Sequence, residues 1–455
     1  MSDIADMKKM RRKVVSASVI GSMMEWYDFF LYAVIAALIL NKQYFPTDAP
    51  FISNLMAWGS VAVAFVSRPL GGVIFGHFGD RVGRKGMLML TLVIMGGSTV
   101  LMGLLPTYNQ IGILAPILLI SLRVLQGIGL GGEWGGAVLM TYEYAEKHNR
   151  CLISGLTQMG LALGMFLASG TIGLLSMLLS EEAFFAWGWR VPFLASAILV
   201  VVGWYIRTSV METPEFEKAR KKEEAKKKNK APLVELFANH KKRVLAAFLA
   251  RGIGGVGFNI MATYVIAFLT QIMNVPKESA LIAVNVGTVF MSIMIPIAGW
   301  LGDRFGLMRV FIIACILEGL CAFPIFYLIM HSGGNIFLLC GGIVIYLGFI
   351  HGIVSSLNPS MFSSLFPTKV RYTGISFTFQ GGSMIFSGLT PMIALTLVQM
   401  NDNQPWLLCT YMLLIGLMSA AASYWIMKDQ QREERENGSE DNDGVCADLA
   451  DVVTV

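Results

Sequence analysis

Long runs of uncharged, mostly apolar residues divide the chain, and the charged residues gather between them. From residue 310 to residue 366, for example, the only formal charge is Glu318. A helix needs about 20 apolar residues to cross the hydrocarbon of a bilayer, so each run is long enough to span. The pattern predicts an all-α membrane protein with twelve transmembrane helices. Their expected bounds are 14–41, 54–78, 87–105, 111–142, 151–179, 190–208, 244–272, 279–301, 309–330, 335–364, 373–399 and 405–427.

The composition also favours a membrane protein over a soluble enzyme. Hydrophobic residues make up 55% of the 455 residues and charged residues 14%, whereas soluble domains hold about 25% charged residues. The six cysteines form no C-x-x-C pair, and no metal-ligand spacing, Ser/His/Asp arrangement or P-loop appears. A G-x-G-x-x-G match at 252–257 lies inside an apolar run, without the strand and turn of a dinucleotide site. We expect no enzyme activity, no metal and, because the basic residues form no reading surface, no nucleic acid partner.

Lysine and arginine are distributed unevenly between alternate loops. If the N-terminus lies inside, the inside segments hold 29 of the 35 basic residues, the outside segments hold three, and three lie within helices. Cytoplasmic loops of membrane proteins carry such an excess. We therefore expect both termini in the cytoplasm, in a chain that crosses a bacterial-type plasma (inner) membrane.

Two charged segments mark the organisation of the chain. The stretch 210–243 is basic and is expected to be a cytoplasmic linker that lies against anionic lipid. The stretch 429–455 is acidic, and its composition is typical of disorder. The predicted organisation is a cytoplasmic tail at 1–13, a six-helix bundle at 14–209, the basic linker, a second six-helix bundle at 244–428 and an acidic cytoplasmic tail.

The two halves of the chain repeat each other. The sequence at 76–85 recurs in shortened form at 299–306, at an offset of 223 residues, and Arg150 corresponds to Arg371 at an offset of 221. Two landmarks at nearly one offset indicate a duplicated six-helix unit. Such repeats are typical of secondary transporters, in which the substrate site lies between the halves near the bilayer midplane.

Several motifs resemble those of one known family. The loop at 76–85 reads G-x-x-x-D-R-x-G-R-K and is similar to the signature loop of the major facilitator superfamily. Other motifs narrow the resemblance to its metabolite:proton symporter family, which includes shikimate, α-ketoglutarate, citrate and proline/betaine permeases. These motifs are EWYDF at 25–29, RPLGG at 68–72, GGEWGG at 131–136, WGWRVPF at 187–193 and FPTKVRYTG at 366–374. The resemblance covers about residues 14–428 and implies two pseudo-symmetric six-helix bundles.

Three charged residues inside predicted helices are candidates for proton coupling. Asp28 and Glu25 lie three positions apart on the first helix, and Arg123 lies about halfway along the fourth. A charge inside a span costs at least about 2.5–3.5 kcal/mol, so it is usually functional and has a partner. Burial favours the neutral carboxyl group and a nearby arginine the ionised one, which suits proton exchange near neutral pH. The resemblance implies that a first-helix acid and a fourth-helix arginine form the protonation switch; a permanent salt bridge between Asp28 and Arg123 is the structural alternative.

Arg251, in the seventh helix, is the candidate anchor for the substrate. An organic anion needs a fixed cation, and a planar guanidinium suits a carboxylate; alternatively, Arg251 extends to the cytoplasmic surface. Further polar residues lie on helices expected to line the cavity, and each could instead bond neighbouring helices together. They are Tyr32, Gln158, Asn259, Tyr264, His351, Asn358 and Gln380. Glu318 receives no role from the sequence.

A last group of charged residues is expected to control gating. The resemblance implies that the two repeated loops latch the inner gate, whereas the structural alternative is a topology signal only. Glu133 is expected near the cytoplasmic mouth, paired either with Arg68 or with loop residues. The gating candidates are Arg68, Asp80, Arg81, Arg84, Lys85, Glu133, Asp303, Arg304 and Arg371.

The sequence therefore predicts a proton-coupled importer of a small polar metabolite, with the proton as coupling ion. The sequence leaves the substrate open between a carboxylate such as shikimate, a 2-oxo or dicarboxylic acid, and a betaine. A proton-antiport exporter, an uncoupled facilitator and a membrane sensor that has lost transport are the alternatives. The absence of proline between Pro116 and Pro192 disfavours the drug antiporters, which usually carry a Gly-Pro motif on helix five. The expected partners are the metabolite, the proton and the lipid bilayer, with the protein as a monomer.

Overall fold

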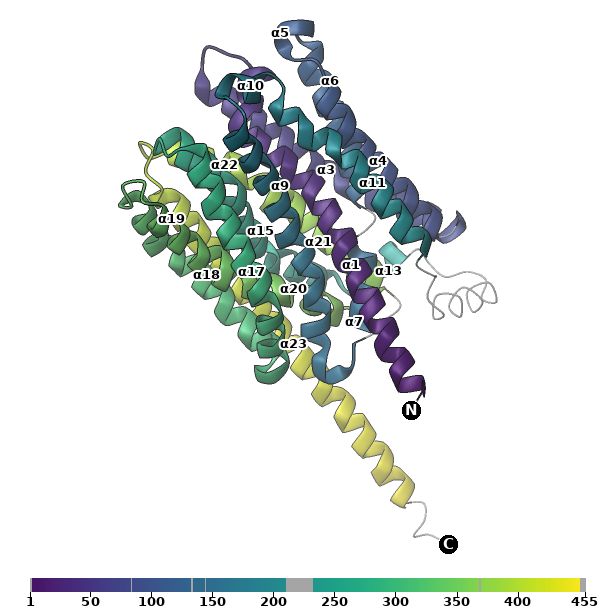
Figure 1. Ribbon diagram of the computed structural model, residues 1–455. Coiled ribbons are helices and arrows are strands. Elements are labelled where there is room, and N and C mark those ends of the chain that lie inside the picture. Colours follow the sequence, from purple (N-terminus) through teal and green to yellow (C-terminus); the bar gives the residue numbers. More distant parts are fainter. Residues whose placement is uncertain are drawn as a thin grey trace.

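In the computed structural model of the protein, the described residues are 2–82, 84–131, 134–143, 145–209, 232–367 and 370–450. Helices joined by short turns make up this part of the chain (Figure 1). A bilayer offers no water to the backbone, so apolar runs of this length form helices, which satisfy their backbone groups internally. Among the described residues, eleven helices are long and apolar enough to span, and Met89–Leu104 is a shorter apolar helix. The twelve predicted spans are confirmed.

The first half of the chain runs from α1 to α11. Its elements are α1 (Ser2–Ile35), η1 (Ala36–Leu40), α2 (Asn41–Gln43), α3 (Pro50–Val82), α4 (Arg84–Leu104), α5 (Tyr108–Ile111), α6 (Leu114–Gly131), α7 (Trp134–Glu143), η2 (Lys147–Asn149), α8 (Arg150–Gly155), η3 (Leu156–Gln158), α9 (Met159–Leu178), α10 (Glu181–Ala186), η4 (Gly188–Arg190) and α11 (Val191–Ser209).

The second half runs from α13 to α23. Its elements are α13 (Pro232–Asn239), α14 (Lys241–Ala250), α15 (Gly252–Phe258), η5 (Asn259–Tyr264), α16 (Val265–Ala267), η6 (Phe268–Ile272), α17 (Lys277–Phe305), α18 (Leu307–Met330), α19 (Ile336–Ile343), η7 (Val344–His351), α20 (Gly352–Ser364), α21 (Arg371–Ser383), η8 (Met384–Gly388), α22 (Thr390–Met400) and α23 (Trp406–Ala450).

The two halves lie side by side, and both termini lie at the same end of the molecule (Figure 1). Within the first half, α1 packs along α9, and α3 along α6; within the second, α18 packs along α23. The halves meet where α17 packs on α8 and α9, where α20 packs on α8, and where η8 and α21 pack on α3. We call the end that holds the termini the terminal end, and the other the opposite end.

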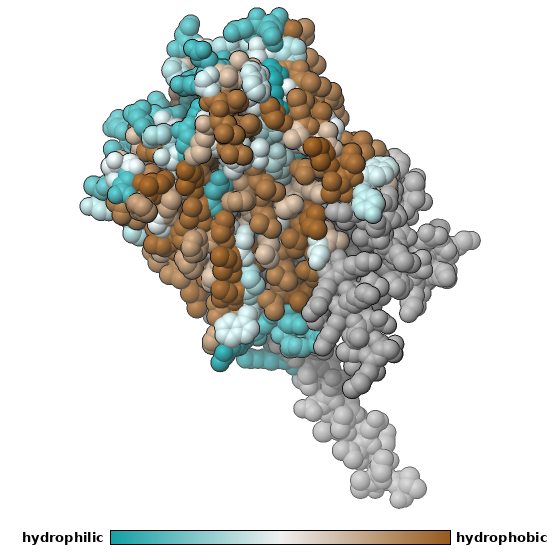
Figure 2. All heavy atoms as spheres, in the orientation of Figure 1, coloured by the Kyte–Doolittle hydropathy of each residue, from teal (hydrophilic) through white to brown (hydrophobic). Residues whose placement is uncertain are grey.

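The outer surface of the helices is apolar, as a lipid-facing surface must be. Apolar side chains form a broad band around the middle of the visible face, and hydrophilic side chains gather at its two ends (Figure 2). Leu178, Ile198 and Phe337 each expose two thirds or more of their surface. In a soluble protein so large an exposed apolar surface would cause aggregation, so this band identifies a multi-pass membrane protein.

The structure adds helices to three charged segments of the chain. The N-terminal tail continues α1 back to Ser2, and residues 232–239 of the basic linker form α13, whose Leu236 is fully buried; residues 210–231 lie outside the described part. The acidic segment, expected to be disordered, continues α23 as far as Ala450. Ion pairs of Arg243 with Asp429 and Glu433 hold the start of that extension against α14.

Candidate functional site

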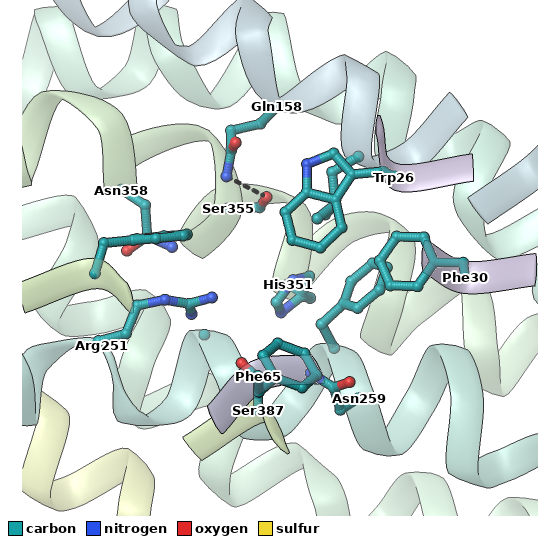
Figure 3. A pocket seen from close by; sticks show the side chains of 14 residues that line it. Trp26, Phe30, Phe65, Gln158, Arg251, Asn259, His351, Ser355, Asn358 and Ser387 are labelled. Atoms are coloured by element: carbon teal, nitrogen blue, oxygen red, sulfur yellow. Dashed lines mark hydrogen bonds between the residues drawn. The ribbon is translucent and has the colours of Figure 1, made fainter. Parts of the chain in front are cut away.

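A small cavity lies between the two halves, and polar side chains from both of them face it (Figure 3). Its lining residues are Trp26, Phe30, Phe65, Gln158, Leu161, Arg251, Gly254, Phe258, Asn259, His351, Ser355, Asn358, Phe379 and Ser387. Five predicted substrate-binding residues are therefore brought together, namely Gln158, Arg251, Asn259, His351 and Asn358. The structure thus assembles a polar chamber from helices that are far apart in the sequence.

Three of the predicted lining residues do not line the cavity. Tyr32 turns towards α3, where its hydroxyl donates to Ser60 Oγ at 2.7 Å. Tyr264 is buried beside Trp58, and Gln380 donates from Nε2 to the Gly131 carbonyl oxygen at 3.4 Å. Helical position alone did not show which way these side chains point, and a role of the three in substrate binding stays a prediction.

Arg251 is the cation of the cavity. Its side chain is 8% exposed, so it does not extend to the surface, and its guanidinium lies 4.5 Å from the centre of the Phe379 ring. Among the described residues, no hydrogen-bond partner faces its buried Nε and Nη1 atoms. Asn358 Oδ1 is likewise buried without a partner. Buried donors of this kind are rare in proteins unless a ligand or water completes them.

Aromatic rings close the cavity towards the terminal end. The ring of Trp134, in α7, stacks on Phe379, in α21, with the ring centres 3.3 Å apart. Phe362 packs edge-on against both rings. Phe379 therefore separates Arg251, on its cavity side, from a contact between the two halves. This wall was not predicted, because aromatic residues in a span look like ordinary core or lipid-facing residues.

Hydrogen bonds and aromatic contacts join the halves towards the opposite end. Gln271 donates from Nε2 to the Ala37 carbonyl oxygen at 2.9 Å and accepts at Oε1 from Asn54 Nδ2 at 3.0 Å. Nearer the cavity, the rings of Phe30 and Phe258 lie 5.1 Å apart. Contacts on both sides of the cavity describe a nearly enclosed chamber.

Local widening of three helices aims polar groups at the cavity. Asn259 begins the π-helical turn η5, His351 ends η7, and Ser387 lies within η8. A π-helical turn inserts a residue into an α-helix and rotates the side chains that follow it, and such turns are frequent at functional sites. The α-helical period therefore could not predict the faces of these helices.

Glu318 pairs with His351 behind the cavity wall. Glu318 Oε1 lies 2.7 Å from His351 Nδ1, and the two side chains are 0% and 2% exposed. The sequence showed that Glu318 is isolated in an apolar run, which signals a function, but gave no partner. The partner lies on the next helix, 33 residues away.

Asp28 and Arg123 are both buried, but they do not meet. Asp28 Oδ1 accepts from Ser196 Oγ, in α11, at 2.6 Å. Arg123 donates to the backbone oxygens of Ser60 and Val61 at 3.3 Å each and to the Gln126 side chain. In the described part of the chain no ion pair joins Asp28 to Arg123, so the expected partnership is wrong. Each instead bonds to a different neighbouring helix.

Glu25 and Arg68 form a second charged region beside α1. Arg68 is 2% exposed, and its guanidinium lies 4.5 Å from the ring centres of both Phe29 and Phe65. The charge of Glu25 acts on Arg68, which ties the two together electrostatically. Glu133, the partner suggested by the sequence for Arg68, lies outside the described residues.

Asp303 makes the clearest contact among the gating candidates. Its two carboxylate oxygens accept from the backbone N–H groups of Cys151 and Leu152, each at 2.9 Å. These groups belong to the first turn of α8, where the helix dipole favours a negative charge. The last turn of α17, in the second half, therefore holds a first-half helix, which the latch interpretation requires.

The other gating candidates contribute less to this interface. Arg304 packs over the rings of Trp300 and Phe305 on its own helix, 5.2 and 5.5 Å from their centres, and its gating role stays a prediction. Arg371 donates from Nε to the Phe366 carbonyl oxygen at 3.0 Å. The remaining four candidates lie near the junction of α3 and α4, and their side chains are outside the described residues; they are Asp80, Arg81, Arg84 and Lys85.

Comparison with solved structures shows the same fold. A proton:xylose symporter, XylE, superposes with a TM-score of 0.72 at 16% identity, covering 92% of this chain and 96% of that one. The inward-open form of XylE from E. coli gives a TM-score of 0.66. These superpositions show a shared fold, and at 16% identity they say nothing about the substrate.

Curated relatives are more similar in sequence. A shikimate transporter of Escherichia coli (strain K12) is 37% identical over 424 residues, which covers 92% of this chain and 95% of the relative. The inner membrane metabolite transport protein YhjE of the same strain is 42% identical, covering 84% and 87%. A glycine betaine/proline/ectoine/pipecolic acid transporter, OusA, of Dickeya dadantii (strain 3937) is 33% identical, covering 90% and 82%.

The family assignment follows from these matches and from the fold. Residues 18–391 match the sequence model of the Major Facilitator Superfamily. The match spans both bundles and the cavity between them, which agrees with the resemblance found in the motifs. The chain is therefore a membrane transporter and not an enzyme, and it belongs to the major facilitator superfamily.

Proposed function

We propose that the protein is a proton-coupled symporter that takes up a small organic carboxylate by alternating access. The observation that carries the proposal is Arg251, a buried cation in the central cavity whose Nε and Nη1 atoms have no partner among the described residues. A carboxylate would accept hydrogen bonds from this guanidinium, and charge-assisted bonds of this type are the strong ones.

The relatives support a carboxylate by the chemistry of the substrates in their names. Shikimate, glycine betaine, proline, ectoine and pipecolic acid each carry one carboxylate group, and they differ in the rest of the molecule. Around Arg251 the cavity offers Gln158, Asn358 and Ser355 as hydrogen-bonding groups and several aromatic rings. The hydroxyl groups of a substrate would bond to the hydrogen-bonding side chains. The methylene or methyl groups of a cationic substrate would pack against the aromatic rings.

Proton coupling would supply the driving force. One proton that enters the cell releases roughly 2.3 kcal/mol per 100 mV of membrane potential, and about 1.4 kcal/mol more per unit of pH difference. Asp28 remains the proposed coupling acid of the first half, because it is buried and accepts hydrogen bonds from the neutral hydroxyl groups of Ser196 and Thr99. We place both termini in the cytoplasm, as the basic residues predict, and propose a monomer.

The test is uptake in right-side-out membrane vesicles, with labelled shikimate, 2-oxoglutarate, citrate and glycine betaine as the panel. We expect at least one compound to accumulate when the outside is made acidic, and an uncoupler to abolish the accumulation. Equal uptake with and without the gradient would identify a facilitator. Accumulation only in inverted vesicles would identify an exporter.

A further inference from the structure

The pair of Glu318 and His351 is built into the wall of the proposed substrate cavity. His351 lines the cavity (Figure 3), whereas Glu318 lies behind it on α18. One carboxylate oxygen of Glu318 bonds to the imidazole at 2.7 Å, and the other, Oε2, is buried without a hydrogen-bond partner among the described residues. The imidazole is thus the only link we find between this carboxyl group and the cavity within the described part of the chain.

Two glycines of α15 place this pair beside the substrate anchor. A Cβ atom on Gly257 would lie 1.8 Å from Glu318 Oε1 and 3.1 Å from the Tyr346 hydroxyl oxygen. A Cβ atom on Gly254 would lie 3.1 Å from Arg251 Nη1 and from Asn358 Nδ2. Residues three apart share one face of a helix. Because Gly254 and Gly257 carry no side chain, Arg251 with Asn358 and Glu318 with Tyr346 can approach the same face of α15, one turn apart.

The charged and titratable groups around Glu318 are few. His351 and Arg251 both act on its charge, and Glu318 in turn acts on Tyr346 and Cys315. Cys321 and Cys409 act on Tyr346 from the adjoining helices. Thiols and phenols titrate above neutral pH, so Tyr346 and the cysteines stay neutral under physiological conditions. The carboxyl group of Glu318 and the imidazole of His351, whose Oε1 and Nδ1 atoms lie 2.7 Å apart, are therefore the pair in this cluster that can share an added proton.

The charge balance of this cluster predicts coupling. With the cavity empty, the positive Arg251 balances a negative Glu318 beside a neutral His351. A bound carboxylate adds one negative charge, and an uncompensated charge in a low-dielectric interior is costly. Addition of one proton to the pair restores neutrality without breaking any covalent bond, and release of that proton accompanies release of the carboxylate.

We propose that Glu318 and His351 form a proton-binding site that takes up one proton for each carboxylate bound at Arg251. The inference rests on the proposed function and extends it, because it assigns the substrate-linked proton to the second half. Asp28 is a separate site, since it bonds to α11 within the first half. Linkage is reciprocal, so the proton and the carboxylate each strengthen the binding of the other.

The experiment counts protons during binding. Purified protein in lipid nanodiscs is titrated with shikimate, whose carboxylate is its only charged group, by calorimetry in buffers of different ionisation enthalpy. We expect one proton to be taken up per carboxylate bound. Above neutral pH the affinity should then fall about tenfold per pH unit, because each unit removes about 1.4 kcal/mol of linked proton binding. Glu318→Gln should bind without proton uptake and without that slope, and the matched control Glu182→Gln, on an exposed helix, should behave like the wild type.

A second measurement needs no substrate. Infrared difference spectra between the wild type and Glu318→Gln are recorded across pH. As the pH falls, a protonated carboxyl band should appear if Glu318 takes the proton, or a carboxylate band should be lost and an imidazolium band gained if the pair shares it. The absence of any pH-dependent difference would overturn the inference, even if the variant bound no ligand.

The outcomes separate this inference from the proposed function. If proton uptake persists in Glu318→Gln and disappears in Asp28→Asn, the linked proton belongs to the first half, so the inference is wrong while symport stands. If transport ignores the pH gradient, the proposed function is wrong, and the infrared titration alone decides whether the pair binds a proton.

Discussion

Replacement of Arg251 by glutamine tests the cation on which the transport proposal depends. The substitution removes the charge and most donors but keeps a polar side chain of moderate length in the same place. Arg251 lies in the cavity over the Phe379 ring and has two buried nitrogen atoms without partners among the described residues. If a carboxylate binds there, Arg251→Gln loses a desolvated charge pair, and Arg251→Lys keeps the charge but loses the planar fork.

The expected magnitude follows from the burial of Arg251. Loss of one member of a buried, hydrogen-bonded charge pair costs about 2–5 kcal/mol of binding, which is roughly a 30- to 5,000-fold rise in the dissociation constant for Arg251→Gln. One charge-assisted hydrogen bond contributes about 1.5–3 kcal/mol, so Arg251→Lys should weaken binding by roughly 10- to 150-fold.

The assay is carboxylate-driven exchange in proteoliposomes, with thermal unfolding of the purified variants in the same lipid. Without substrate, Arg251→Gln should change Tm little, because loss of the contact with the Phe379 ring and of the charge that acts on Glu318 offsets relief from burying an incompletely hydrogen-bonded guanidinium. Stabilisation by added substrate should disappear in the same variant. Wild-type affinity in Arg251→Gln would refute the carboxylate assignment, and a lower Tm without substrate would show that Arg251 serves the fold instead.

Two further substitutions test particular contacts. Asp303→Ala removes the hydrogen-bond acceptors for the first turn of α8, and loss of a helix cap costs about 0.5–2 kcal/mol. The substitution should therefore open the terminal end and raise the alkylation rate of buried Cys151, measured peptide by peptide, by up to about 30-fold. An unchanged alkylation rate would argue against the latch. Gly257→Ala forces a Cβ atom against Glu318 and should destabilise the protein by about 1–3 kcal/mol. The control Gly341→Ala, where a Cβ atom would meet nothing within 4 Å, should leave Tm unchanged. Equal Tm values in the two variants would contradict the packing described for α15.

The sequence by itself determined the spans, the two halves and the family. A backbone in lipid must satisfy its hydrogen bonds internally, so twelve apolar runs become twelve helices whatever surrounds them. A repeated loop motif fixed the duplication, because two copies of one motif can be compared without any coordinates. The sequence also singled out Arg251 as a candidate cavity cation, since a charge in a span rarely faces lipid, but it left open that the side chain extends to the cytoplasmic surface.

Only the tertiary structure decided which charged groups meet. Asp28 bonds to Ser196 rather than to Arg123, and Glu318 finds His351 on the next helix. These pairings depend on the rotation of each helix about its axis and on π-helical turns that shift the face of a helix part-way along it. The hydropathy of a span is an average over its residues. It does not depend on which residue carries the polar side chain, so it does not specify how the helix is rotated about its axis.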